Sequence, residues 1–292
     1  MGYLVHNASV NLEERRIASG FAFLEREAGF EISESPFLRY GASNTYLSAL
    51  LVGIGNTLRV AVIGIAAATL LGAAVGLFRL SKNFLLRTLA AAYVEFIRNS
   101  PLLVQLFFWY AVITEALPMP REALQPLPGV FLTNRGLYFP APGSVPVLEG
   151  FNFAGGFVLT PEFMALLIGL TVYTAAFIAE IVRAGILAVS QGQWHAAFAI
   201  GLTRGQALRR VVVPQALRVM VPPMASQYLN ITKNSSLAVA IGYPELVSIA
   251  NTAINQTGQA IEGVAIIMAV YLTISLSISA FMNWYNARIG RR

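Results

Sequence analysis

The sequence predicts an all-α integral membrane protein, a bundle of about five transmembrane helices. Three observations lead to this prediction: the composition, the long apolar stretches and the placement of basic residues between them. Of the 292 residues, 56% are hydrophobic and only 12% are charged, a combination that is unusual for a water-soluble domain of this size. Lipid is therefore the main solvent of this chain.

Five apolar stretches reach or approach the about 20 residues that a helix needs to cross a hydrocarbon core about 30 Å thick. They are residues 47–78, 89–117, 163–189, 219–241 and 264–285. Pro101 predicts a bend in the second stretch, because proline lacks a backbone donor and frees a carbonyl. Pro222 and Pro223 break the fourth, so neighbouring helices must shield it from lipid.

Basic residues gather in alternate connections. Arginine and lysine are frequent after the first, third and fifth stretches and rare in the other connections, which places the frequent ones and the C-terminus in the cytoplasm. The N-terminus is then external, although the arginines of the N-terminal segment argue the other way. The net charge of +6 follows from this arrangement, and a nucleic-acid partner is not expected because the basic residues flank apolar runs.

Two segments outside the apolar stretches are expected on the external side. Residues 1–44 are rich in charge and contain no long apolar run, so we expect an extracytoplasmic or interfacial segment. Within it, residues 19–32 either lie on the membrane surface as an amphipathic segment or belong to a solvated tail. The external loop 118–160 is rich in proline and glycine and predicts an irregular loop.

Several kinds of chemistry are excluded by composition. There is no cysteine, and the two histidines, His6 and His195, are far apart, so no metal site is expected. A phosphate-binding loop needs Gly-Lys followed by Ser or Thr, whereas the two lysines, Lys82 and Lys233, follow Ser81 and Thr232. The chain is therefore not expected to hydrolyse ATP.

The segment between the third and fourth stretches, residues 190–214, carries the functional prediction. It predicts a short helix, a turn at Gly201, and a second short amphipathic helix closed by Pro214. Two short helices at an angle would form a rigid cytoplasmic projection. The alternative is a basic loop that only sets the topology.

The spacing in this segment resembles the coupling loop of importer permeases in the ATP-binding-cassette (ABC) superfamily. Ala196, Ala197, Gly201 and Pro214 match the two alanines, the glycine and the proline of that pattern, and His195 stands where the family usually has glutamate. The resemblance implies that the loop docks on an ATPase subunit. The residues assigned to ATPase coupling are His195, Ala196, Ala197, Gly201, Arg204 and Pro214.

Residues 95–110, 173–185 and 228–238 resemble the polar amino-acid branch of this family, in particular the general L-amino-acid importer permeases. The resemblance implies a type I importer transmembrane domain over residues 45–292. It also implies an ATPase dimer that holds ATP and Mg, a second permease subunit that is identical or a paralogue, and a periplasmic amino-acid-binding protein. No cofactor is expected on this chain itself.

Polar residues within the apolar stretches are candidates for the substrate pathway, since a charge at the membrane centre is costly without a partner or water. They are Thr174, Glu180, Asn230, Lys233, Asn234 and Ser235. For Glu180 the alternative is structural neutralisation by Arg183, three residues later. For Asn230 and its neighbours, the alternative is bonding to backbone freed by the prolines. Glu95 and Arg98 are expected to form a structural ion pair.

Two other classes of function remain to be compared with an importer subunit. An ion-coupled secondary transporter or channel would account for Glu180 and Lys233, but not for a cytoplasmic loop of this spacing. A membrane-embedded enzyme would need paired acids near a histidine or a metal-ligand cluster, and neither is found. Importer function is therefore the main hypothesis.

Overall fold

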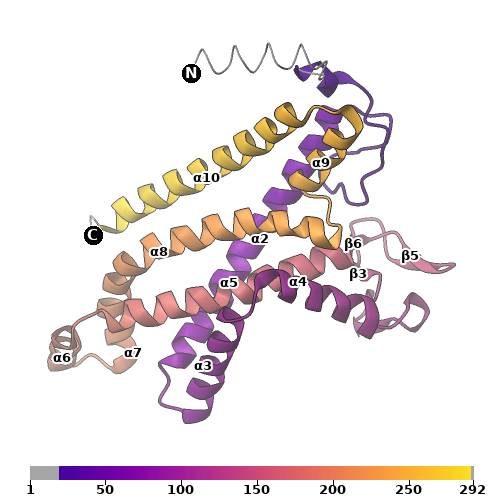
Figure 1. The fold of residues 1–292 in the computed structure, drawn as a ribbon. Coiled ribbons are helices and arrows are strands. Elements are labelled where there is room, and N and C mark those ends of the chain that lie inside the picture. Colours follow the sequence, from indigo (N-terminus) through magenta and orange to yellow (C-terminus); the bar gives the residue numbers. More distant parts are fainter. Residues whose placement is uncertain (1–19, 291–292) are drawn as a thin grey trace, which may run out of the picture. The chain divides into compact units, whose positions relative to one another are not determined.

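The computed structural model describes residues 20–290 and is mainly helical (Figure 1). Residue contacts divide the chain into two units. The first unit comprises the residues up to Arg59 together with Ser236–Ile274, and the second unit comprises Val60–Ser235 together with Ser275–Arg292. The candidate functional residues between Glu95 and Ser235 all belong to the second unit.

Among the described residues, three helices are long and apolar enough to cross a membrane: α2 (Tyr46–Arg79), α5 (Pro161–Leu187) and α10 (Ala260–Gly290). Two further pairs pass the same test when each is taken together across a short break. One pair joins Phe84–Arg98 to Leu102–Ala116, and the other joins Arg204–Ile241 to Leu246–Thr257. Counting each pair as one crossing gives five, which agrees with the predicted bundle.

The bend expected at Pro101 is confirmed. Helix α3 (Phe84–Arg98) and the helical segment that begins with α4 (Leu102–Ala111) meet at an angle of 106°. Pro101, the N-cap of α4, has no N–H to donate to the end of α3. The side-chain amide of Gln105 replaces the missing donor, with its Nε2 3.1 Å from the carbonyl oxygen of Ile97 and 3.3 Å from that of Ser100.

Close contact between α2 and α5 in the second unit depends on glycines. A Cβ added at Gly72 would lie 2.7 Å from the side chain of Ile178, and one added at Gly76 would lie 2.8 Å from the carbonyl oxygen of Ala179. These glycines are four residues apart, so they lie on one helix face. Small residues in this spacing let membrane helices approach closely, where lipid offers no hydrophobic driving force.

We expect Gly72→Leu to destabilise the second unit by roughly 2 kcal/mol or more, because a bulky side chain separates α2 from α5. The matched control is Ala66→Leu, which places the same side chain at an exposed position of the same helix. Thermal unfolding of the purified protein in detergent should show a lower midpoint for Gly72→Leu alone. Equal midpoints for the two variants would show that the helices do not depend on this contact.

The fourth predicted crossing is not broken at its prolines, contrary to the sequence-based expectation. Helix α8 (Val213–Asn234) runs through Pro222 and Pro223 and gives way to a 3₁₀ segment, η5 (Ser235–Ile241), only after Asn234. The prolines remove helical donors, but unwinding in lipid would leave many more backbone groups without partners. Both prolines also lie on the exposed surface of α8, where their rings do not disturb packing.

The external segment is not an irregular loop, which corrects the second sequence-based expectation. The segment begins with a 3₁₀ turn, η3 (Pro120–Glu122). One antiparallel sheet follows, with the strand order β1 (Leu124–Leu127), β2 (Val130–Thr133), β3 (Gly136–Phe139) and β6 (Phe157–Leu159). A second, two-stranded sheet consists of β4 (Val147–Glu149) and β5 (Asn152–Ala154). Glycines with positive φ lie in turns that join short strands, such as Gly129 with φ +77° between β1 and β2. Stacking of Phe131 on Phe153, with ring centroids 4.5 Å apart, connects the two sheets.

Over the part that the structure describes, the N-terminal segment is packed against the rest of the first unit and is not a solvated tail; residues 1–19 lie outside it. A short 3₁₀ helix, η1 (Phe21–Glu25), is followed by an extended segment, and Phe23 and Ala28 are buried with Tyr46 and Leu50 of α2. Helix α9 (Leu246–Thr257) completes this core of the first unit. The apolar residues of this segment thus belong to a packed core.

Buried polar contacts tie the same segment to the first turns of α2. Glu34 is 7% exposed and forms an ion pair with Arg59. The amide of fully buried Asn56 donates to the carbonyl oxygens of Glu34 at 2.8 Å and Pro244 at 2.9 Å. The carboxylate of Glu245 caps α9 at the backbone N–H of Ser248, 2.8 Å away. The first unit is therefore a specifically packed structure and not a loose terminus.

Candidate functional site

The loop at residues 190–214 folds into a helical hairpin. Helix α6 (Gln191–Ala199) ends at Gly201, whose φ of +81° is left-handed. The N–H of Gly201 bonds the carbonyl of Phe198 at 2.9 Å, and that of Leu202 bonds Ala197 at 3.1 Å. These two bonds are the Schellman pattern, which ends a helix sharply and favours glycine. The predicted turn at Gly201 is thus confirmed.

A capping box starts the second helix of the loop. Helix α7 (Arg204–Ala207) begins after Thr203, whose Oγ accepts from the N–H of Gln206 at 3.4 Å while Gln206 accepts from the N–H of Thr203 at 2.9 Å. Sequence reasoning did not use this feature, although Thr203 and Gln206 have the spacing of the motif. The turn between α6 and α7 is therefore fixed by local hydrogen bonds on both sides.

Pro214 does not close the second helix, which corrects the sequence-based expectation. After α7 the backbone continues as a π-helical segment, η4 (Leu208–Val212), directly into α8. Pro214 lies in the first turn of α8, where a missing N–H costs little. The wider hydrogen-bonding pattern of η4 accommodates the lost donor without ending the helix. Helix α7, η4 and α8 thus follow one another without a break.

Figure 1 shows α5 and α8 side by side, with α6 and α7 at the end where α5 stops and α8 starts. Within α6 the predicted coupling residues differ in exposure. His195 and Ala196 are exposed, whereas Ala197 is 2% exposed and anchors the helix. Phe198 and Ile200 are 46% and 76% exposed among the described residues, so α6 and its C-terminal end present an apolar surface. Such a surface is typical of a protein interface.

Gly201→Ala should weaken the hairpin by about 1 kcal/mol, because an L-residue is strained at a left-handed φ. An added Cβ would meet nothing within 4 Å, so the effect is conformational and not steric. Gly205→Ala is the matched control, since Gly205 lies inside α7 and is equally unobstructed. The yield of ATPase subunit that co-purifies should fall for Gly201→Ala alone. Equal yields for both variants would contradict a role for this turn in docking.

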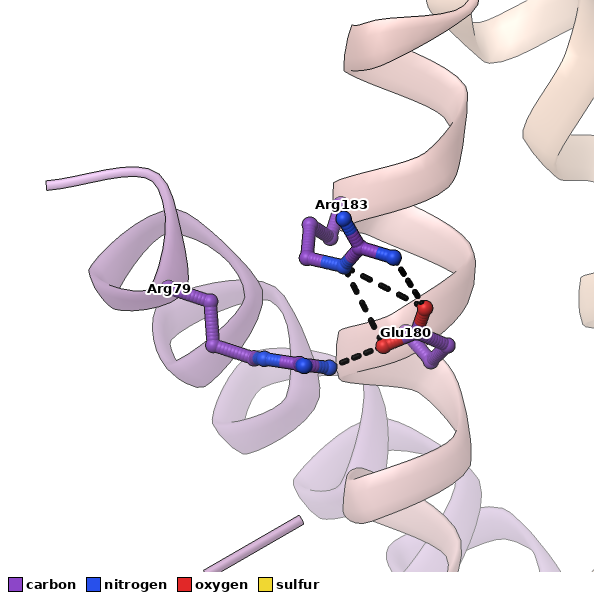
Figure 2. Close-up of polar contacts among 3 residues, drawn as sticks. All are labelled: Arg79, Glu180 and Arg183. Atoms are coloured by element: carbon purple, nitrogen blue, oxygen red, sulfur yellow. Dashed lines mark hydrogen bonds and ion pairs between the residues drawn. The ribbon is translucent and has the colours of Figure 1, made fainter. Parts of the chain in front are cut away.

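Glu180 lies between two arginines, one on its own helix and one on α2 (Figure 2). Its carboxylate forms an ion pair with Arg79 of α2 and accepts from Arg183, with Nη2 2.5 Å and Nε 3.2 Å from Oε1. The predicted pairing with Arg183 is confirmed, whereas no sequence signal pointed to Arg79. Because both carboxylate oxygens are occupied, the geometry favours the structural interpretation of Glu180.

The expected ion pair between Glu95 and Arg98 is not formed, although both residues are described. Both lie on the exposed surface of α3. The guanidinium carbon of Arg98 lies 5.1 Å from the ring centroid of Phe177 on α5. A cation above an aromatic ring of the neighbouring helix replaces the local pair, since three-residue spacing permits an ion pair but does not require it.

Of the remaining pathway candidates, Asn230 and Lys233 share one exposed face of α8 with Ser226. The spacing of four and then three residues places them in one row. Asn234 is half-buried, and Ser235 is buried with its hydroxyl donating to the carbonyl of Thr232 at 2.7 Å. Thr174 on α5 is 2% exposed. The buried hydroxyls of Ser235 and Thr174 are therefore not part of this exposed row.

No group of three or more His, Cys, Asp or Glu side chains within residues 20–290 could hold a metal ion. Two features of the second unit are candidates for its function: the polar row on α8 and the α6–α7 hairpin. The first offers a hydroxyl, an amide and a cation along a membrane helix. The second offers an exposed apolar surface next to the beginning of α8.

The model of the family "Binding-protein-dependent transport system inner membrane component" matches residues 62–291. The chain belongs to this family. It is thus the transmembrane subunit of an ABC importer, as the sequence predicted, and ATP hydrolysis belongs to a separate subunit.

Named relatives agree with this assignment. The putative amino-acid ABC transporter permease protein YhdX of Escherichia coli K12 is 45% identical, covering 99% of this chain and 90% of that protein. The general L-amino acid transport system permease protein AapQ of Rhizobium johnstonii is 43% identical, covering 99% and 88%. The alignment with YhdX spans 355 positions, more than the 292 residues here, so this relative carries internal sequence that the permease chain lacks.

Solved structures confirm the fold. The permease resembles an amino acid ABC transporter crystallised with histidines at 26% identity and a TM-score of 0.63, over 83% of this chain and 95% of that one. Its fold is also similar to a chain of the inward-facing methionine transporter MetNI, with 18% identity and a TM-score of 0.60, over 83% and 97%. The predicted type I importer fold is therefore confirmed.

Proposed function

We propose that this permease forms part of the pathway of an ATP-driven amino-acid importer, with the polar row on α8 lining it. The row consists of Ser226, Asn230 and Lys233. Polar side chains exposed along a membrane helix are costly against lipid, so they face water, substrate or another subunit. The ammonium group of Lys233 suits the carboxylate of an amino acid, and the amide of Asn230 can bond either end of it.

Amino acids are the proposed substrate class because relatives that cover nearly the whole permease carry amino-acid permease names. The coverage of 99% of this chain supports the same cargo class. Selection among amino acids would rest mainly on a soluble binding protein on the periplasmic side. The pathway itself needs only weak, transient contacts, because a tightly held substrate cannot leave.

The α6–α7 hairpin is the proposed docking site for an ATPase dimer that holds ATP and Mg. His195, Ala196, Gly201, Arg204 and Pro214, which are all exposed, would lie at or next to this contact, while buried Ala197 supports it from inside the permease. Since η4 joins α7 to α8 without a break, movement of the hairpin is transmitted to the polar row. Alternation between inward and outward openings would follow from ATPase closure.

The remaining assignments follow from the same scheme. A second permease, identical or a paralogue, would supply the opposite wall of the pathway. The basic connections and the C-terminus would face the cytoplasm and the N-terminus the periplasm, following the distribution of basic residues. Residues 45–292 would then form the transmembrane domain and residues 118–160 its periplasmic sheets.

Affinity purification of the tagged permease from its native membrane, followed by identification of the chains that accompany it, tests this proposal. We expect an ATPase subunit and a permease partner in the purified complex, and an amino-acid-binding protein after mild cross-linking. Cysteine introduced in place of Arg135, which is exposed between β2 and β3, should react with an impermeant maleimide from the periplasm. A permease that purifies without an ATPase and transports amino acids alone would be an ion-coupled carrier, contrary to the proposal.

A further inference from the structure

A basic cavity lies between the first turns of α8 and the last turns of α10, within the second unit. It has a volume of about 600 Å³. Its polar lining comes from Arg210 in η4, Gln215 and Arg218 in α8, and Tyr285 and Arg288 in α10. The segments that meet here are far apart in the sequence, so no sequence pattern indicated the cavity.

The charges around this cavity are all of one sign. No carboxylate lines it, and Arg210, Arg218 and Arg288 form no ion pair with any residue in the range 20–290. Three guanidinium groups that share one cavity repel one another, and an anion between them would relieve the repulsion. Guanidinium groups offer paired N–H donors that match phosphate oxygens, so a phosphate is the best-suited anion.

The end of α10 also has the features of a membrane boundary. Phe281, Trp284 and Tyr285 form an aromatic cluster, with ring centroids 5.9 Å and 6.5 Å from Phe281 to the other two. The guanidinium carbon of Arg288 lies 5.3 Å from the ring centroid of Trp284. Tryptophan and tyrosine are enriched at the depth of lipid headgroups, with arginine just beyond. The cavity is therefore at headgroup depth.

We infer that the cavity binds the phosphate headgroup of an anionic phospholipid of the phosphatidylglycerol type. The three arginines would hold the phosphate, while Tyr285 and Gln215 can bond the glycerol hydroxyls. The acyl chains would lie against the apolar side of α10, where Leu276 and Phe281 are each 60% exposed. Basic pockets between membrane helices bind anionic headgroups in this way. The site would hold α10 against the beginning of α8.

Native mass spectrometry of the complete transporter, purified with its partner subunits, tests the site. Phosphatidylglycerol and phosphatidylcholine are added separately, and bound lipid is counted for the wild type, Arg218→Gln/Arg288→Gln and Arg87→Gln/Arg209→Gln. The last variant removes two charges outside the cavity lining. We expect phosphatidylglycerol affinity to fall at least about tenfold only in the cavity variant, with phosphatidylcholine unaffected.

The charge-retaining variant Arg218→Lys/Arg288→Lys covers the case in which the glutamine variant folds poorly, and it should keep most of the binding. Equal phosphatidylglycerol binding in the wild type and the glutamine variant would overturn the site, as would equal loss in the lysine variant. If free glycerol phosphate at the same concentration displaced the lipid, the ligand of the cavity would be a soluble phosphate, and the inferred lipid site would be wrong. Loss of the ATPase subunit with unchanged lipid binding would make this surface a protein contact, also contrary to the inference.

Discussion

Lys233→Met should reduce amino-acid uptake at least about tenfold while leaving assembly with the ATPase intact. The side chain lies on the exposed polar row of α8, where the proposed pathway requires a cation for the substrate carboxylate. Methionine preserves the length and flexibility of the side chain and removes only its charge. A lost charge-assisted hydrogen bond is worth about 1.5–3 kcal/mol, which corresponds to at least a tenfold effect. Uptake into proteoliposomes, measured at equal amounts of complex, gives the value.

Lys82→Met is the matched control, because Lys82 is the other lysine of the chain and is exposed between α2 and α3. It should transport normally. Asn230→Leu should reproduce part of the loss, since Asn230 lies on the same face of α8. Normal uptake by Lys233→Met would show that the polar row serves another purpose, such as contact between subunits.

The second large effect is expected for Glu180→Gln, which leaves Arg79 and Arg183 without their shared carboxylate. Glutamine keeps the shape of the side chain but cannot neutralise two guanidinium groups. Because the carboxylate is partly exposed, the cost should be about 1–3 kcal/mol, below that of a fully buried pair. A lower thermal midpoint of the purified complex would report this loss.

Glu95→Gln is the matched control, since Glu95 lies on the exposed surface of α3 and forms no ion pair within residues 20–290. Its free energy of unfolding should change by no more than about 0.5 kcal/mol, as is typical of surface substitutions. Its thermal midpoint should therefore stay close to that of the wild type. The double variant Arg79→Gln/Glu180→Gln should lose less than the sum of its single variants, because the two residues contact each other. Additive losses, or a stable Glu180→Gln with defective uptake, would return Glu180 to the substrate pathway.

The sequence predicted the positions of helices well where they depend only on residues within the same helix. Apolar length alone located α2, α5 and α10, and Pro101 located the bend between α3 and α4, since each depends on local properties. The turn at Gly201 was equally predictable, because a left-handed residue leaves few alternatives to glycine. The fold class and the family followed from these local features together with the spacing of the coupling loop.

Features that depend on distant residues were not predictable in this way. Arg79 reaches Glu180 across 101 positions of sequence, and Glu34 reaches Arg59 only because the N-terminal segment folds back along α2. The strands between Leu124 and Leu159 are three or four residues long, too short for a clear alternation of apolar and polar residues. Local signals were also overridden at Pro214, which the π-helical η4 accommodates, and in α8, where lipid penalises the helix break that Pro222 would favour in water.

Amino-acid uptake into proteoliposomes tests the central claim most directly. The complete transporter, with its ATPase and binding protein, is compared with the permease alone, each with ATP or ADP inside the vesicles. We predict uptake only for the complete transporter with ATP, because the proposed roles of this permease are the pathway and the docking hairpin, while ATP hydrolysis belongs to a separate subunit. Uptake by the permease alone, driven by an ion gradient and indifferent to ATP, would contradict the account.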